Sequence, residues 1–327
     1  MDGELSQSLI LQSIVLQSLI VMAAITSDFL SPKPRSLWQN AMRYLFRQRS
    51  AVVGMLILGI LLFCAIMAPV LATHDPEATL IGKEDVKKRE SPCIHLLGCA
   101  ADKPEHYFGL DGNLRDLYSR VLFGARLSLL VGFTSVGFAI VIGTVLGALA
   151  GYLGGWTDNV IMRVMDVLLA FPSLILTIAI VTVLGPGLVN TLIAIGVVSI
   201  PSYARVVRAS VLSIKEMDYI TADRSIGTPA MRILFSHVMP NALTPLVVQA
   251  TLGIAGAILD AAALSFLGLG AQPPTPEWGS MIGAERNQVF TAPHLILFPG
   301  LALILTVLGF NLLGDGLRDA LDPRLNR

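Results

Sequence analysis

The chain has 327 residues, of which 54% are apolar and only 14% are charged, whereas soluble domains carry about 25% charged residues. Its 23 basic and 23 acidic residues cancel, so no basic surface argues for a nucleic-acid partner. Three cysteines exclude a disulfide scaffold and a four-cysteine zinc site. The composition therefore predicts an all-α membrane protein: a polytopic bundle of about six transmembrane helices, with no room for a second soluble domain.

Residues 1–30 contain three copies of a five-residue unit, which begin at Gln7, Gln12 and Gln17. A period of five matches neither a helix nor a strand. The pattern predicts a repeat-like extension that is poorly ordered or forms an interfacial helix, and an extra spanning helix is the competing interpretation. No basic stretch precedes it, so we do not expect a cleaved signal peptide. Translation from Met22 is an alternative start.

Residues 31–50 combine five basic residues with Trp38, Tyr44 and Phe46. Aromatic rings at the level of the headgroups and cations on the inner side are typical of a helix lying on a membrane. We expect an amphipathic cytoplasmic helix here, followed directly by the first transmembrane helix at residues 51–72.

Residues 73–125 form a long loop with both signs of charge, and we expect it to be extracytoplasmic. It ends in an amphipathic stretch, 114–122, that is predicted to lie along the membrane surface. If the loop faces an oxidising compartment, Cys93 and Cys99 can form a disulfide, although so small a ring limits its entropic effect. A metal site is the weaker alternative, since only His95 lies between the two cysteines.

Residues 126–327 are predicted to form the core of the bundle, with five further transmembrane helices, at 127–153, 160–184, 188–209, 242–267 and 293–313. Gly143, Gly147 and Gly151 recur every four residues, and small residues at this spacing let another helix approach closely within lipid. Proline removes one backbone hydrogen bond, so Phe171-Pro172 predicts a bend in the third spanning helix, and Pro201 a kink in the fourth.

Asp260 lies inside the fifth predicted spanning helix. A carboxylate there costs a few kcal/mol on insertion scales, so it should face the bundle or water. A substrate-pathway group and a proton relay are both compatible with this position.

The distribution of lysine and arginine predicts the orientation. If both termini and the loop at 201–240 face inward, 14 of the 23 basic residues lie on the cytoplasmic side, and most of the others lie in the single long loop. The positive-inside rule therefore places both termini in the cytoplasm.

The longest polar run between two apolar segments of the C-terminal half is 215–241. It predicts an elbow of two short helices, with Gly227 supplying a positive φ and Thr228-Pro229 starting the second helix. A loop that only packs on its own protein is the plain alternative.

The motifs in this elbow resemble the loop written E-A-A-x3-G-x9-I-x-L-P in permease subunits of bacterial ABC importers. Gly227, Met239 and Pro240 occupy the Gly, Leu and Pro positions, whereas Thr221 and Asp223 replace the usual Glu and the second Ala. His237 in the Ile position resembles the peptide-transporter branch. Further motifs resemble the C-type permease of dipeptide and oligopeptide importers over residues 36–327: 108–111, 115–116, 124–126, 171–173, 265–270, 272–276 and 278–279.

This resemblance implies a type I ABC importer permease in the bacterial inner membrane. The expected partners are a second permease in a heterodimer, two ABC ATPase subunits, an extracytoplasmic substrate-binding protein and a peptide substrate. The elbow would couple to the ATPases through Asp218, Tyr219, Ile220, Thr221, Ala222, Asp223, Gly227, Met231, Phe235, His237, Met239 and Pro240. Its apolar side, with Tyr219, Ile220, Ile226 and Met231, would fill an ATPase groove.

Three alternatives stay open. Nickel and glutathione importers belong to the same branch, and an ion-gradient-driven transporter would use Asp166 and Asp260 as relays. A non-transporting membrane scaffold would have no ATPase partner for the elbow. An enzyme is not expected: the one Gly-Lys pair, at Gly82, lacks the phosphate-binding pattern, and no metal-ligating or nucleophile motif appears. We therefore expect no catalytic residues, metal or cofactor in this chain.

Overall fold

The computed structural model describes residues 37–321, and the regular elements of this part of the chain are helices. The chain divides into two units, residues 1–43 and 44–327. Helix α2 (Leu37–Arg47) lies within the stretch predicted to form an amphipathic helix. The predictions for residues 1–30 lie outside the described residues.

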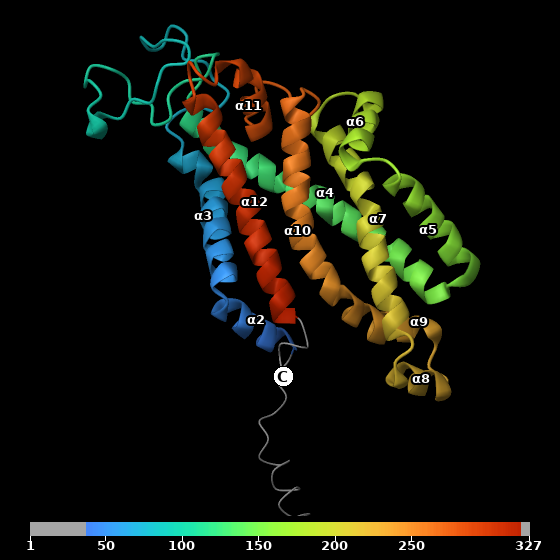
Figure 1. Cartoon of the computed structure of the whole chain (residues 1–327). Coiled ribbons are helices and arrows are strands. Elements are labelled where there is room, and N and C mark those ends of the chain that lie inside the picture. Colours follow the sequence, from blue (N-terminus) through green and yellow to red (C-terminus); the bar gives the residue numbers. More distant parts are fainter. Residues whose placement is uncertain (1–36, 322–327) are drawn as a thin grey trace, which may run out of the picture. The chain divides into compact units, whose positions relative to one another are not determined.

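The second unit is a bundle of long helices (Figure 1). Helix α12 packs on α3 and α10, α10 also packs on α7, and α4 runs obliquely across this row and packs most extensively on α7. Among the described residues, five helices are long and apolar enough to span a membrane, and a bent pair makes a sixth. The main helices are α3 (Arg49–Leu71), α4 (Leu117–Leu153), α7 (Leu188–Ile214), α10 (Met239–Phe266) and α12 (His294–Leu321).

The third predicted spanning helix is broken rather than merely bent. Helices α5 (Gly155–Leu169) and α6 (Ser173–Leu184) meet at 90°. Pro172 has no N–H to donate, and a proline also disfavours helical geometry in the residue before it. Neither half reaches the length of about 20 residues that a spanning helix needs. By contrast, α7 continues as one helix through Pro201.

Helix α4 begins earlier than the sequence indicated. The stretch predicted to lie along the membrane surface becomes, from Leu117 onward, the first turns of α4. Asp116 caps this helix, because its side chain accepts a hydrogen bond from the Ser119 N–H at 2.8 Å. At 37 residues, α4 is about 55 Å long, which is more than a hydrocarbon core of about 30 Å requires.

Three glycines of α4 lie against α7. A Cβ on Gly143 would lie 2.7 Å from the Tyr203 Cβ, and a Cβ on Gly147 would collide with the carbonyl oxygen of Ala204. A Cβ on Gly151 would lie 3.0 Å from a carbonyl oxygen of α7. The two backbones therefore approach so closely that side chains at these positions would force them apart.

We expect Gly147→Ala to destabilise the protein by about 1–3 kcal/mol, the usual effect of overpacking a core. Gly137→Ala is the matched control on the same helix, because a Cβ there meets nothing within 4 Å. Thermal unfolding in detergent measures both variants. Equal unfolding temperatures would contradict the close packing.

The two ends of the bundle differ. The α3–α4 loop and α11 (Trp278–Glu285) lie at one end, and α8 and α9 lie at the other (Figure 1). Helix α11 lies between the two last predicted spanning helices, 242–267 and 293–313. It is held there because Trp278 is buried and its indole N–H donates to the carbonyl of Val121 at 3.0 Å.

The α3–α4 loop contains the short helix η1 (His95–Leu97) and a disulfide between Cys93 and Cys99. Arg89 in this loop forms an ion pair with Glu285 of α11, with 2.8 Å between Nε and Oε2. This ion pair thus fastens the loop to α11 at the same end of the bundle. A second short helix, η3 (Arg286–Gln288), follows α11.

Candidate functional site

The candidate site is the elbow, residues 215–241, which joins α7 to α10. It contains α8 (Asp218–Ser225), a turn, α9 (Ala230–Ile233) and the π-helical segment η2 (Leu234–Val238). The two short helices are present, and the second of them, α9, continues through η2 into α10. Pro240 cannot donate to the carbonyl four residues earlier, and the wider π turn carries the helix past it.

The turn after α8 has the geometry of a Schellman motif. The Thr228 N–H donates to the carbonyl of Asp223 at 3.1 Å, and the Gly227 N–H donates to the carbonyl of Arg224 at 3.0 Å. Gly227 has φ +78°, as its sequence context predicted. Pro229, rather than Thr228, directly precedes the first residue of α9. The turn thus sets the angle between α8 and α10.

The inner face of the elbow is part of the hydrophobic core. Ile220, Ile233, Leu234 and Val238 are each at most 6% exposed and belong to the same buried cluster as the transmembrane helices. The expectation that Ile220 lies on a docking surface is therefore wrong. One face of α8 packs on its own protein, and Ile220 lies on that face.

Two hydrogen bonds fasten the elbow to the end of α4. The Lys215 ammonium donates to the carbonyl of Gly151 at 2.9 Å, and the Tyr152 hydroxyl donates to the carbonyl of Ala230 at 2.8 Å. These contacts hold both the entry and the exit of α8 against α4. Sequence patterns did not single out Lys215 or Tyr152, because nothing local indicates what either side chain reaches.

Two ion pairs join α5 to α7 next to the elbow. Arg208 contacts the Asp158 carboxylate through Nε at 2.5 Å and Nη2 at 2.6 Å, which is the bidentate arrangement typical of arginine. Arg205 contacts Asp166 at 2.6 Å. Asp166, considered above as a proton relay, is thus paired with a cation.

A further polar contact lies within the elbow itself. His237 of η2 and Asp223 of α8 approach to 3.6 Å between Nε2 and Oδ2. Asn241 extends the contact, since its amide donates to the carbonyl of His237 at 2.8 Å. Asp223 stands where the usual motif has its second alanine. His237 stands in the Ile position of the motif, as in the peptide-transporter branch.

The outer face of the elbow is apolar and uncovered in this chain. Tyr219 is 42% exposed, Ile226 79%, and Met231 and Phe235 63% each, and Met217 belongs to the same surface at 44%. Hereafter these five residues are called the outer face. Met217 was not among the residues expected to couple to the ATPases, because an apolar residue before a helix looks the same in sequence whether it is buried or exposed.

The other predicted elbow residues surround the outer face. Asp218, Thr221, Ala222, Gly227 and Pro240 are exposed, whereas Asp223, His237 and Met239 are half-buried. An apolar surface with a polar surround, on an element whose opposite face is locked into the core, is typical of a binding surface for another protein.

The remaining candidates lie away from the elbow. Asp260 is half-buried in α10 and makes no hydrogen bond or ion pair with residues 37–321. The three α4 glycines form the contact with α7, and the disulfide lies in the loop at the other end of the bundle. The structure therefore assembles the elbow residues, but not these others, into one site.

Two family descriptions match the chain. Residues 143–327 match the binding-protein-dependent transport system inner membrane component. Residues 36–92 match the N-terminal transmembrane domain of oligopeptide transport permease C.

Curated relatives cover nearly the whole chain. The dipeptide transport system permease protein DppC of Alkalihalophilus pseudofirmus is 47% identical over 89% of this chain and 91% of the relative. The di/tripeptide permease protein DppC of Pseudomonas aeruginosa is 45% identical over 90% and 93%. The glutathione permease protein GsiD of Pectobacterium atrosepticum is 44% identical over 89% and 92%.

Among solved structures, a chain of the inward-facing MetNI methionine ABC transporter superimposes with a TM-score of 0.52. It is 23% identical, and the match covers 62% of this chain and 97% of that chain. At this identity the likeness shows a shared fold.

Proposed function

The chain belongs to the family of binding-protein-dependent transport system inner membrane components, and we propose that the cargo it passes is a short peptide. It is a membrane permease subunit of an ABC importer, with the fold of such permeases. The transport subunit itself carries no nucleotide-binding motif, and in the proposal ATP is hydrolysed on separate subunits.

The observation that carries the coupling mechanism is the two-sided elbow. Its inner face is buried in the bundle, and its outer face is exposed and apolar. In the proposal the outer face fills a groove on an ATPase subunit, as an amphipathic helix does. Because Lys215 of the elbow donates to the Gly151 carbonyl of α4, and Tyr152 of α4 donates to the Ala230 carbonyl of the elbow, a push on the elbow moves α4, α7 and α10 together.

The two ends of the bundle face opposite sides of the membrane in this proposal, and each end meets different partners. The elbow end faces the cytoplasm in this proposal, because the basic residues gather on that side. The α3–α4 loop and α11 then face outward, where a substrate-binding protein delivers the cargo. A second permease completes the translocation path, and the chain's termini lie in the cytoplasm.

The relatives of this chain are named for more than one substrate. The relatives named for dipeptides and di/tripeptides are 47% and 45% identical to this chain, and the relative named for glutathione is 44% identical. Glutathione is itself a tripeptide, so all three relatives support a short peptide as the class of substrate. Among these, we assign dipeptides and tripeptides with ordinary α-peptide bonds.

The test is uptake by cells that lack this chain, with and without the gene restored. We expect uptake of a radiolabelled dipeptide to fall at least tenfold in the deletion and to return on complementation, while uptake of glutathione and of nickel stays unchanged. Loss of glutathione uptake alone would identify glutathione as the substrate instead. Unchanged uptake of all three would overturn the assignment.

A further inference from the structure

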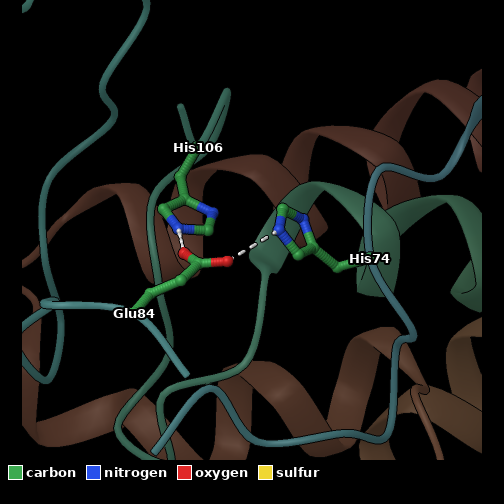
Figure 2. Close-up of side chains that lie close together, drawn as sticks. All are labelled: His74, Glu84 and His106. Carbon is green, nitrogen blue, oxygen red and sulfur yellow. Dashed lines mark hydrogen bonds and ion pairs between the residues drawn. The ribbon is translucent and has the colours of Figure 1, made fainter. Parts of the chain in front are cut away.

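Three titratable side chains outside the elbow converge in the α3–α4 loop (Figure 2). Glu84 lies between two imidazole rings: its Oε1 is 3.4 Å from the Nε2 of His74, and its Oε2 is 3.1 Å from the Nε2 of His106. His74 follows α3 by three residues, and the other two belong to the loop. The Nε2 atom of each ring thus points at the carboxylate of Glu84.

The spacing of these atoms suits a tetrahedral metal ion. Zinc bonds of about 2.0–2.1 Å to nitrogen and oxygen place neighbouring ligand atoms about 3.3–3.4 Å apart. The two nitrogen–oxygen distances, 3.1 and 3.4 Å, are close to that value, but they run to different oxygens of Glu84, so the carboxylate must turn to present one oxygen to both rings. The ligand atoms of all three side chains lie within 4.8 Å of one another, and His74, about a quarter exposed, can rotate to shorten the remaining edge.

The other ring nitrogens already have partners. The Nδ1 of His106 lies 3.0 Å from the Oδ1 of Asp116, and the Nδ1 of His74 lies 2.9 Å from the Thr73 hydroxyl. A carboxylate on the far nitrogen of a histidine is the usual support of a metal ligand, because it fixes the tautomer and the ring orientation. His106 and Asp116 are only 2% and 1% exposed, so this support is rigid.

We propose that His74, Glu84 and His106 bind one divalent zinc ion, with water in the fourth position. Two neutral imidazoles and one carboxylate are the ligands of many zinc sites with an open coordination position. The ion would replace the hydrogens between the rings and Glu84. It would also join the end of α3 to the start of α4, since Asp116 both supports His106 and caps α4.

The ligands of the zinc site belong to a loop fastened to α11 through Arg89 and Glu285, so a bound ion would stabilise this loop. The competing explanation is a set of ion pairs in which the imidazoles are protonated and no metal binds. Metal titration separates the two.

The experiment uses the full chain in its transporter complex, purified without a histidine tag and stripped with a chelator. Zinc is titrated in competition with a chromophoric chelator, and cobalt is added as a spectroscopic probe. We expect one zinc ion per copy of this chain and the intense visible absorption of four-coordinate cobalt. Absence of saturable binding by the unmodified chain would overturn the proposal.

The variants are His74→Ala and Glu84→Gln, because both side chains are partly exposed and their loss should leave the fold intact. We expect each to weaken zinc binding at least tenfold and to remove the cobalt spectrum. His95→Asn is the matched control: His95 is an exposed histidine of the same loop whose Nε2 contacts a carbonyl, that of Lys103. Unchanged affinity in both variants, or equal loss in the control, would contradict the site.

Discussion

Gly227→Val will reduce peptide uptake at least tenfold and leave insertion of the protein intact. Gly227 has φ +78°, and an L-residue in the left-handed region costs about 1–2 kcal/mol. A Cβ at this position would meet nothing within 4 Å, so the whole effect comes from backbone strain. The turn relieves this strain by changing the angle between α8 and α10, and the outer face then no longer matches its partner.

Gly227→Asn is the matched control, because asparagine is the non-glycine residue that most readily adopts this conformation. Uptake and ATP hydrolysis by the reconstituted transporter are measured for both variants. We expect hydrolysis without uptake for the valine variant and near-normal coupling for the asparagine variant. Normal uptake by the valine variant would refute the role of the turn.

Met231→Asp together with Phe235→Asp will release the ATPase subunits from the purified complex. Both side chains are 63% exposed in the free chain, so the change costs the fold little. In the complex, however, it places two charges in an apolar contact, and an unpaired buried charge is strongly unfavourable. Phe290→Asp, on a side chain 99% exposed in the loop before α12, is the control and should retain the ATPases.

Ile220→Ala separates docking from folding. Ile220 is fully buried, and loss of a buried isoleucine side chain costs about 2–5 kcal/mol. We expect a lower unfolding temperature for this variant and an unchanged one for the aspartate variant. If the aspartate variant keeps its ATPases in detergent while Ile220→Ala loses them without destabilisation, the two faces of the elbow are assigned the wrong way round.

Several structural features could be predicted from the sequence, because they depend on local chemistry. Long apolar runs predicted the spanning segments, since each stretch of backbone in lipid must satisfy its own hydrogen bonds as a helix. A proline in the third such run predicted a departure from a straight helix. Gly227 predicted a positive φ, because only a residue without a Cβ adopts that backbone geometry freely.

Other features depend on partners far along the chain. Trp278 holds α11 in place through the carbonyl of Val121, a contact across more than 150 residues that no local pattern indicates. The cluster of His74, Glu84 and His106 is similar, because its members are separated by loop residues with no regular period. No local pattern therefore indicates that these two histidines lie together.

The amino-acid sequence by itself determined the class of the protein, its spanning segments and the existence of an elbow, because hydropathy and backbone freedom are properties of the residues themselves. Only the tertiary structure decided which side of the elbow is buried. Ile220 and Tyr219 are adjacent and both apolar, yet one lies in the core and the other on the outer face. Burial depends on what packs from elsewhere in the chain, and that is settled only when the bundle assembles.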